Sequence, residues 1–477
     1  MASETMKLPH VAVTASPGLG HVIPLLEFSK RLVIEHGVHV SFLVMNTNEQ
    51  PSAAQAQLLQ SPNLPPGLQV VDLPPVDVSA VASVRFTRLC TIAEESLKSL
   101  RSVLMEIGKP QALIIDLFAS QAFDIFSELS IPIYSFFTTS VAFFTFALYL
   151  PTLDREVEGE FIDLPEPIGI PGCSSVRPED LLDHVRNRKN DDYKWFSFHM
   201  RRLPLAAGIF LNSWEDLEPV SLKAIREHRF YLQIPTPPIY PIGPLIKQDE
   251  PLIVSDEEYL AWLDKQPSDS VLFVALGSGG TLSAEQLAEM AWGLELSKQR
   301  FIWVVRKPSD ATAATYFNVG SDVNDPKTYL PEGFLDRTQG VGVVIRSWAK
   351  QAAVLRHPST GGFLSHCGWN SSLESIYHGV PMIAWPLYSE QRMNAALLTE
   401  EIGVAVKPVL EHGKKVIERE EIKRVVRLLM ESEEGKVIRH RVKKLKESGV
   451  RALGKGGSSY ESFACVVEKW KEDEATK

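Results

Sequence analysis

The chain has 477 residues, of which 44% are hydrophobic and 23% charged, and its formal net charge is -10. This length exceeds one ordinary hydrophobic core, so we expect two domains, and the composition is that of a soluble globular enzyme. The negative charge argues against nonspecific binding to nucleic acid or to an anionic membrane, because both require a basic surface.

The start of the chain and the cysteines indicate a compartment. Residues 1–10 contain no apolar segment of the kind that a secretory signal carries. The four cysteines lie far apart and form no C-x-x-C pair, which predicts neither a disulfide framework nor a zinc site. We therefore expect a reducing, cytoplasmic location.

The first half of the chain alternates short β-branched runs with helical patterns. The strand candidates are residues 10–15, 38–44, 112–117, 131–137 and 208–214. Such alternation predicts a parallel, doubly wound sheet.

Residues 131–150 carry no formal charge and are long enough to span a bilayer. Pro132 and the polar cluster at 138–140 divide this stretch into a strand, a turn and a helix. Because buried strands of α/β proteins read as continuous apolar runs, we expect a buried strand followed by a helix, and no membrane span.

The second half repeats the pattern after an interruption. A proline-dense segment at 234–245 is expected to lack regular structure, and residues 308–331 are expected to form a long surface loop. The strand candidates that follow are residues 271–278, 301–306, 341–348, 361–368 and 380–386.

These patterns predict an α/β protein with two Rossmann-like domains that face each other across a cleft. We expect an N-terminal domain at 1–245, a linker at 246–259 and a C-terminal domain at 260–455. Residues 456–477 are expected to form a helix that can pack back on the N-terminal domain.

A turn between a strand and a helix in the second half is a candidate anion site. Gly368 and Trp369 precede Asn370 and Ser371 here, and the free backbone N–H groups of a helix N-terminus suit a diphosphate. Glu374 lies one helical turn further on, where a carboxylate can accept hydrogen bonds from ribose hydroxyls. Each residue alone also fits a simpler interpretation, a helix cap or a solvated charge.

Further candidates lie at the ends of three strands that follow one another in the sequence. Trp348 can stack on a base or belong to the core, and His366 can donate to phosphate or be a buried core histidine. Glu390 and Gln391 lie after the strand at 380–386, where a carboxylate and an amide can bracket the hydroxyls of a hexose. All of them fall at carboxyl ends of strands, the edge at which α/β sheets bind ligands.

The first half offers an acid–base pair. His21 begins a helix directly after the first strand, and Asp116 ends an apolar strand, so both can reach the cleft. A buried carboxylate behind an imidazole fixes its tautomer and stabilises the cation formed on taking a proton. A helix cap and a strand-end turn former are the alternative interpretations.

Several other enzyme classes lack their signatures. The segment at 18–23 has no third glycine of a dinucleotide fingerprint, and there is no G-x-x-x-x-G-K-[ST] loop or G-x-S-x-G elbow. No Asp-x-Asp pair is present to hold a metal on a diphosphate, so we expect no metal. The helix dipole and side-chain donors must then meet the charge of the leaving group.

The 44 residues from Trp348 to Gln391 resemble, without a gap, the signature box of plant family-one UDP-glycosyltransferases that act on small secondary metabolites. The resemblance extends over the chain and includes FLNSWEDLEP and YPIGPL. It implies the GT-B arrangement of two Rossmann-like domains, inversion at the anomeric carbon, and UDP-glucose as a co-substrate without a further cofactor.

The resemblance also assigns roles. His21 would be the catalytic base and Asp116 its supporting carboxylate. The terminal Gln391 is the form associated with glucose donors. The donor contacts that it implies are Trp348, Ala349 and Gln351 for the base and ribose, Glu374 for the ribose, Ser278, His366, Trp369, Asn370 and Ser371 for the diphosphate, and Glu390, Gln391 and Thr138 for the sugar.

One position departs from the family pattern, because Lys350 stands where Trp-Ala-Pro-Gln has proline. We expect donor binding to be retained with a locally looser or re-aimed loop.

The predicted function is an inverting, metal-independent UDP-glucose glucosyltransferase, active as a monomer on the hydroxyl of a small aromatic such as a phenol, hydroquinone or indoxyl. The phrasing LIIDLFASQAFD and WPLYSEQRMNA resembles the hydroquinone glucosyltransferase subgroup. Another UDP-sugar, an N-acceptor such as an aniline, and a non-catalytic nucleotide-sugar-binding protein remain alternatives.

Overall fold

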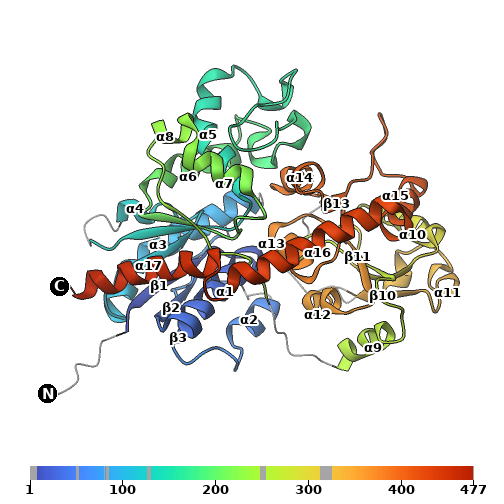
Figure 1. Ribbon diagram of the computed structural model, residues 1–477, viewed down its shortest axis with the longest axis horizontal. Coiled ribbons are helices and arrows are strands. Elements are labelled where there is room, and N and C mark those ends of the chain that lie inside the picture. The colour runs from blue at the N-terminus through green and yellow to red at the C-terminus, as the bar shows by residue number, and fades with distance from the viewer. Residues whose placement is uncertain are drawn as a thin grey trace.

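The computed structural model describes residues 8–49, 53–79, 81, 85–125, 130–247, 254–311, 325–346 and 348–475. It contains two α/β domains, which Figure 1 colours from blue to green and from yellow to red. Each domain is built on one parallel sheet covered by helices, which confirms the predicted pair of Rossmann-like domains.

The N-terminal sheet has the strand order β3-β2-β1-β4-β5-β6-β7, and all its pairings are parallel. Its strands are β1 His10–Ala15, β2 His39–Val44, β3 Leu68–Asp72, β4 Ala112–Asp116, β5 Ile133–Phe137, β6 Gly208–Leu211 and β7 Ile239–Pro241. The prediction that residues 234–245 lack regular structure is wrong, because β7 lies within them. Its Pro241 is tolerated because β7 is an edge strand, where a missing N–H breaks no ladder.

The N-terminal helices cover both faces of this sheet (Figure 1). They are α1 Leu19–His36, α2 Ala53–Leu59, α3 Arg85–Glu106, α4 Ala122–Ile125, α5 Val141–Glu156, α6 Asp191–Arg202, α7 Pro219–Glu227 and α8 Arg229–Gln233, with short 3₁₀ turns η2 Phe161–Asp163, η3 Pro178–Asp180, η4 Asp183–Val185 and η5 Leu203–Leu205. The uncharged stretch at 131–150 is strand β5 followed by helix α5, as predicted. Within the described ranges, no helix is both long and apolar enough to cross a membrane.

The C-terminal sheet is also wholly parallel, with the order β10-β9-β8-β11-β12-β13. Its strands are β8 Val271–Ala275, β9 Arg300–Val305, β10 Gly342–Arg346, β11 Thr360–Ser365, β12 Met382–Ala384 and β13 Ala405–Val406. The predicted loop at 308–331 lies largely outside the described residues, and its described end contains the turn η6 Pro326–Thr328.

The C-terminal helices begin earlier than expected, because α9 starts inside the stretch predicted to be a linker. They are α9 Val254–Leu263, α10 Ala284–Ser297, α11 Phe334–Arg337, α12 Gln351–Arg356, α13 Trp369–His378, α14 Gln391–Ala396, the π-helical turn η7 Leu397–Glu401, α15 Arg419–Glu431, α16 Glu433–Leu453 and α17 Ser458–Ala475.

The FLNSWEDLEP and YPIGPL segments join the two domains. The Asn212 amide donates to the carbonyl of Leu245 at 3.0 Å and accepts from its N–H at 2.7 Å. The indole of Trp369 donates to the carbonyl of Asn212 at 2.8 Å. Helix α13, which begins at Trp369, is therefore tied to the joint between the domains.

Helices α16 and α17 run along the front of both domains (Figure 1). Helix α17 packs on α1 and on β7, and the Phe463 ring stacks on Phe28 with centroids 5.4 Å apart. The Ser459 hydroxyl donates to the carbonyl of Gly243 at 2.6 Å. Helix α17 follows the C-terminal domain in the sequence but packs on the N-terminal domain.

Candidate active site

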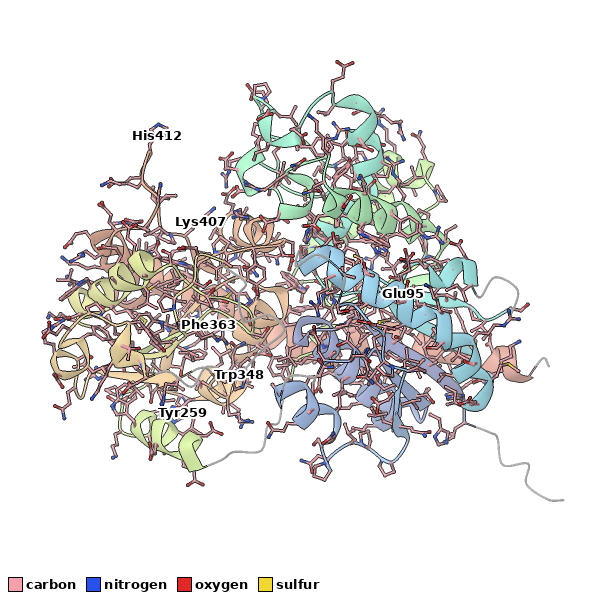
Figure 2. The ribbon with its side chains drawn as sticks, turned by 180° about the vertical axis from the view of Figure 1, so that it is seen from behind. Glu95, Tyr259, Trp348, Phe363, Lys407 and His412 are labelled. Carbon is pink, nitrogen blue, oxygen red and sulfur yellow. The ribbon has the colours of Figure 1, made fainter. Side chains whose placement is uncertain are left out.

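One pocket lies at the carboxyl ends of strands from both sheets. All the site residues predicted from the sequence line it except Asp116, which is buried behind His21. Figure 2 shows Trp348 where the two domains meet, and this side chain packs against the core of the N-terminal domain. The structure thus brings the acid–base pair of the first half together with the 348–391 block.

His21 and Asp116 are in direct contact. His21 Nδ1 lies 2.8 Å from Asp116 Oδ2, and the exposed fractions of the two side chains are 14% and 0%. Because an ionised carboxylate only accepts hydrogen bonds, this contact places a proton on Nδ1 and leaves Nε2 as the basic nitrogen of the neutral ring. The arrangement is that of a general base with its orienting carboxylate.

The other carboxylate oxygen of Asp116 is also held. Asp116 Oδ1 accepts from the Ser16 hydroxyl at 2.8 Å and from the backbone N–H of Phe118 at 3.0 Å. These bonds satisfy the carboxylate in a site without solvent contact, where an unpaired charge would be costly. They also fix the plane of the carboxylate, and hence the direction in which it holds the imidazole.

The N-terminus of α13 faces the same pocket from the C-terminal domain. The Asn370 amide donates to the carbonyl of Gly20, beside His21, at 2.8 Å across the domain boundary. The Gln351 amide donates to Ser371 Oγ at 2.9 Å and to Glu374 Oε2 at 2.7 Å. A helix N-terminus suited to phosphate is thus continuous with polar side chains suited to ribose hydroxyls.

His366 lies against two glycines of this site. A Cβ atom at Gly277 would come within 2.3 Å of His366 Nε2, and one at Gly368 within 2.5 Å. Burial, and secondarily the charge of Arg306, lowers the pKa of His366 to about 3. His366 is therefore a neutral donor at physiological pH. Its Nδ1 has no hydrogen-bond partner among the described residues.

Arg306 is a site residue that the sequence did not single out. It follows β9, is 7% exposed, lines the pocket, and donates through Nη1 to the carbonyl of Gly280 at 3.0 Å. It therefore brings a permanent positive charge to the turn that carries Ser278. The only sequence signal for Arg306 is its position at the end of a strand, and many arginines without a role in a site share that position.

Gly277→Ala is expected to weaken UDP binding by more than about tenfold. The residue has a φ of 72°, and left-handed backbone costs an alanine about 1–2 kcal/mol, to which displacement of the His366 ring is added. Gly340→Ala is the matched control, because Gly340 has a φ of 81° with nothing within 4 Å of the added Cβ. Both variants should lower the Tm, but titration calorimetry should find UDP affinity reduced only in Gly277→Ala. Equal affinities would contradict the role of this turn.

Lys350 is held by a hydrogen bond through its backbone. Its N–H donates to the Tyr259 hydroxyl at 3.1 Å, and that hydroxyl donates to Asp256 at 2.8 Å. Lys350 is 7% exposed, and its φ of -73° is one that proline also adopts. The hydrogen bond to Tyr259 thus supports a backbone φ that proline also adopts, and the expectation of a locally looser or re-aimed loop stays a prediction.

Glu390 and Gln391 lie at the start of α14. The side-chain oxygen of Gln391 accepts from the N–H groups of Leu387 and Tyr388 at 2.9 and 3.1 Å, so its amide nitrogen is the end that can donate to a ligand. The fully buried Asn394 links this corner to the phosphate side, since its amide donates to the carbonyl of Cys367 at 3.0 Å and to Glu390 Oε1 at 3.3 Å. Asn394 had no distinguishing signal in the sequence.

The N-terminal side of the pocket is aromatic. Thr138 Oγ1 lies 3.5 Å from His21 Nδ1, at the boundary between this side and the donor side. Besides His21, the aromatic rings of the N-terminal domain that line the pocket are Phe86, Phe118, Phe143, His184 and Phe196. Other phenylalanines of this half, Phe136, Phe137, Phe144 and Phe146, are core residues. A flat apolar acceptor fits such walls.

Within the described part of the chain, no cluster of three or more His, Cys, Asp or Glu side chains is arranged to hold a metal ion. The positive charge that lines the pocket comes from Arg306 and Lys247.

Comparisons with known proteins agree with this geometry. Residues 212–428 match the family model described as UDP-glucoronosyl and UDP-glucosyl transferase. The hydroquinone glucosyltransferase of Rauvolfia serpentina is 47% identical over 97% of this chain and 98% of its own length.

Two solved structures extend the likeness to the fold. TcCGT1 in complex with UDP is 48% identical, covers 98% of this chain and 100% of its own, and superposes with a TM-score of 0.91. A UDP-glucosyltransferase from Polygonum tinctorium capable of glucosylating indoxyl, solved with 3,4-dichloroaniline, is 43% identical, covers 98% of this chain and 99% of its own, and gives a TM-score of 0.88. The two facing domains are thus the GT-B arrangement, and the chain belongs to the plant family-one UDP-glycosyltransferases.

Proposed function

We propose that this enzyme transfers glucose from UDP-glucose, with inversion, to the hydroxyl of a small planar aromatic. The observation that carries the proposal is the His21–Asp116 pair, which stands between the aromatic wall and the α13 N-terminus in one pocket. A nucleotide-sugar-binding protein without activity has no need for an oriented base at this position. The pair therefore favours catalysis over sensing.

In the proposed reaction, His21 Nε2 accepts the proton of the acceptor hydroxyl as its oxygen attacks the anomeric carbon. UDP leaves from the opposite face, which gives the β-glucoside. Asp116 stabilises the imidazolium that forms. The charge that develops on the diphosphate meets the dipole of α13, the Asn370 amide and the positive charge of Arg306, so we propose that no metal ion is required.

The glucose donor is supported by Glu390 and Gln391, whose carboxylate and amide match adjacent sugar hydroxyls. The aromatic acceptor is supported by the rings around His21, among them Phe118 with centroids 5.3 Å away. An aniline nitrogen is a second candidate acceptor, because the Polygonum tinctorium relative was solved with 3,4-dichloroaniline. We further propose a reducing, cytoplasmic setting, which fits four cysteines that form no disulfide.

A product screen tests the proposal. Purified protein is incubated in EDTA with hydroquinone, indoxyl, 3,4-dichloroaniline and a flavonoid, each with UDP-glucose, UDP-galactose, UDP-xylose or UDP-glucuronate. We expect β-glucosides of the small phenols by mass and proton NMR, with UDP-glucose preferred. Activity only after Mg²⁺ or Mn²⁺ is added would overturn the metal-free mechanism, and UDP binding without any product would favour the sensor.

A further inference from the structure

Ser389, directly before the sugar-site residues Glu390 and Gln391, has an unusual backbone conformation. Its φ is 59°, in the left-handed region that residues with a Cβ rarely adopt. Such a conformation persists only where the surroundings hold it. The contacts of Ser389 therefore show what fixes the start of α14.

The N-terminal domain supplies these contacts through η4. The N–H of Ser389 donates to Asp183 Oδ2 at 2.8 Å, and the N–H of Asp183 donates to the carbonyl of Ser389 at 3.1 Å. His184 Nε2 lies 3.3 Å from Ser389 Oγ. Arg392, on α14, donates to Asp183 Oδ1 at 2.5 Å. Asp183 of the N-terminal domain thus binds both the N–H and the carbonyl of Ser389, a residue of the C-terminal domain in a strained conformation.

The same segment faces the acceptor side of the pocket. The His184 ring stacks on Phe86 with centroids 3.8 Å apart, and Phe86 packs edge-on against Phe118 at 5.0 Å. Phe118 in turn contacts the ring of His21. A continuous row of rings therefore connects the catalytic base to the residue that holds Ser389.

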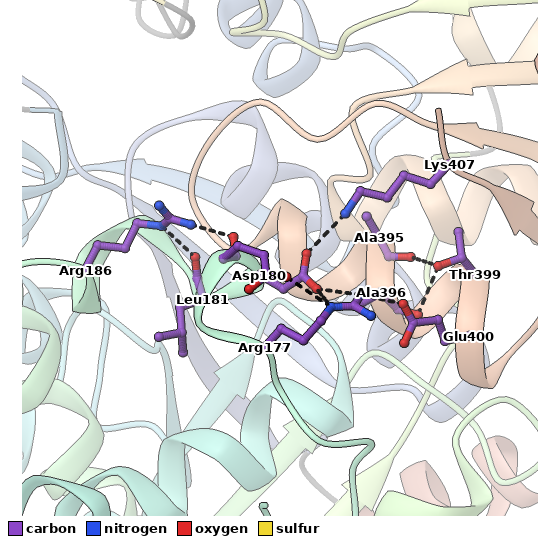
Figure 3. A network of polar contacts seen from close by, with 10 residues as sticks. Arg177, Asp180, Leu181, Arg186, Ala395, Ala396, Thr399, Glu400 and Lys407 are labelled. Atoms are coloured by element: carbon purple, nitrogen blue, oxygen red, sulfur yellow. Dashed lines mark hydrogen bonds and ion pairs between the residues drawn. The ribbon is translucent and has the colours of Figure 1, made fainter. Parts of the chain in front are cut away.

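A second set of interdomain contacts lies a few residues earlier in the chain and does not involve Ser389. Arg177 pairs with Asp180 and with Glu400 at 2.5 Å, and Asp180 pairs with Lys407 at 3.1 Å (Figure 3). These ion pairs connect η3 to η7 and to the segment after β13. Removing these ion pairs weakens the contact between the two domains without touching Ser389, and so serves as a control.

We propose that Asp183 and His184 form an interdomain clamp that holds Ser389 in its left-handed conformation and so positions Glu390 and Gln391 on the hexose. Asp183 acts as a positioning residue, since it contacts Ser389 and Arg392 and is not among the residues that line the pocket. The inference rests on the proposed function of this site as a UDP-glucose site. It implies that recognition of the hexose depends on Asp183 of the N-terminal domain, whereas recognition of the nucleotide does not.

Asp183→Ala tests the clamp. UDP contacts the 348–374 segment in the proposed site, so UDP affinity should stay within about twofold of wild type. The KM for UDP-glucose should rise by about tenfold, because a residue with a Cβ adopts the left-handed conformation only at a cost that corresponds to about this factor, and the clamp no longer offsets that cost. Arg177→Gln, which removes the pairs with Asp180 and Glu400, should leave both quantities within about twofold. An equal rise of the KM for UDP-glucose in the two variants would assign the effect to general weakening of the contact between the domains and overturn the clamp.

A second substitution separates positioning from a loss of folding. Glycine adopts the left-handed conformation without strain, so Ser389→Gly in the Asp183→Ala background should recover most of the lost UDP-glucose affinity. Absence of any rescue, with Tm unchanged, would overturn the clamp. The proposed function is tested separately, by whether the wild-type protein turns over UDP-glucose. The clamp is tested by how the ratio of UDP-glucose affinity to UDP affinity changes among the variants.

Discussion

Replacement of His21 by alanine is expected to lower glucosyl transfer to weakly acidic hydroxyls by about 10²–10⁴-fold, the usual contribution of a positioned general base. UDP affinity should persist, because the proposed nucleotide contacts come from the C-terminal domain and do not include the His21 side chain. The loss should shrink for acidic phenols such as 4-nitrophenol, which need less help to ionise. Initial rates over a series of phenols, with UDP binding measured by calorimetry, provide the test.

His357→Asn is a suitable control for removing an imidazole. His357 Nε2 pairs with Asp264 at 3.1 Å at the C-terminal end of α12, and His357 is not among the residues that line the pocket. This variant should retain wild-type rates across the phenol series. Full activity of His21→Ala on weakly acidic phenols would remove His21 from the role of base. An equal loss for all phenols, whatever their acidity, would assign it to acceptor binding instead.

The strands that carry the site could be predicted because they are central and apolar. Strands β1, β4, β8 and β11 lie in the middle of their sheets and read as continuous hydrophobic runs, so the residues at their carboxyl ends could be placed on one edge. Three strands were missed, β3, β7 and β13. All are short or lie at a sheet edge, where one side of the ladder is open and the apolar run is interrupted.

Asn394 and Asp183, which sequence reasoning missed, act through partners distant in the chain. Asn394 accepts from Ser140, 254 positions earlier, and Asp183 binds Ser389, 206 positions later. An asparagine within a helix and an aspartate in a polar loop are ordinary when read locally. Ser389 gave no signal either, since serine is not a residue from which a left-handed backbone is expected. Such contacts are set by how the domains meet, which periodicity and motif spacing do not specify.

Asp116→Asn is expected to reduce transfer by about 10³–10⁴-fold, although it changes a single atom that never touches substrate. Asp116 Oδ1 accepts from Ser16 and from the N–H of Phe118, so an asparagine should keep its oxygen there and turn its NH2 group toward His21 Nδ1. Nδ1 must then accept, which moves the ring proton to Nε2, the atom that should act as the base. The imidazole is thereby locked in the unproductive tautomer.

Comparison with Asp116→Ala separates this tautomer effect from simple loss of charge. Alanine leaves His21 able to adopt either tautomer, so Asp116→Ala should be more active than Asp116→Asn despite a lower Tm caused by the unsatisfied Ser16 and Phe118 donors. Ser16→Ala keeps the charge and removes one hydrogen bond, and should cost no more than about tenfold. If Asp116→Asn and Asp116→Ala were equally impaired, charge alone would explain the loss; if Asp116→Asn kept wild-type rates, His21 would not depend on the carboxylate. Only the order Ser16→Ala, Asp116→Ala, Asp116→Asn, from most to least active, fits a carboxylate that works by fixing where the imidazole carries its proton.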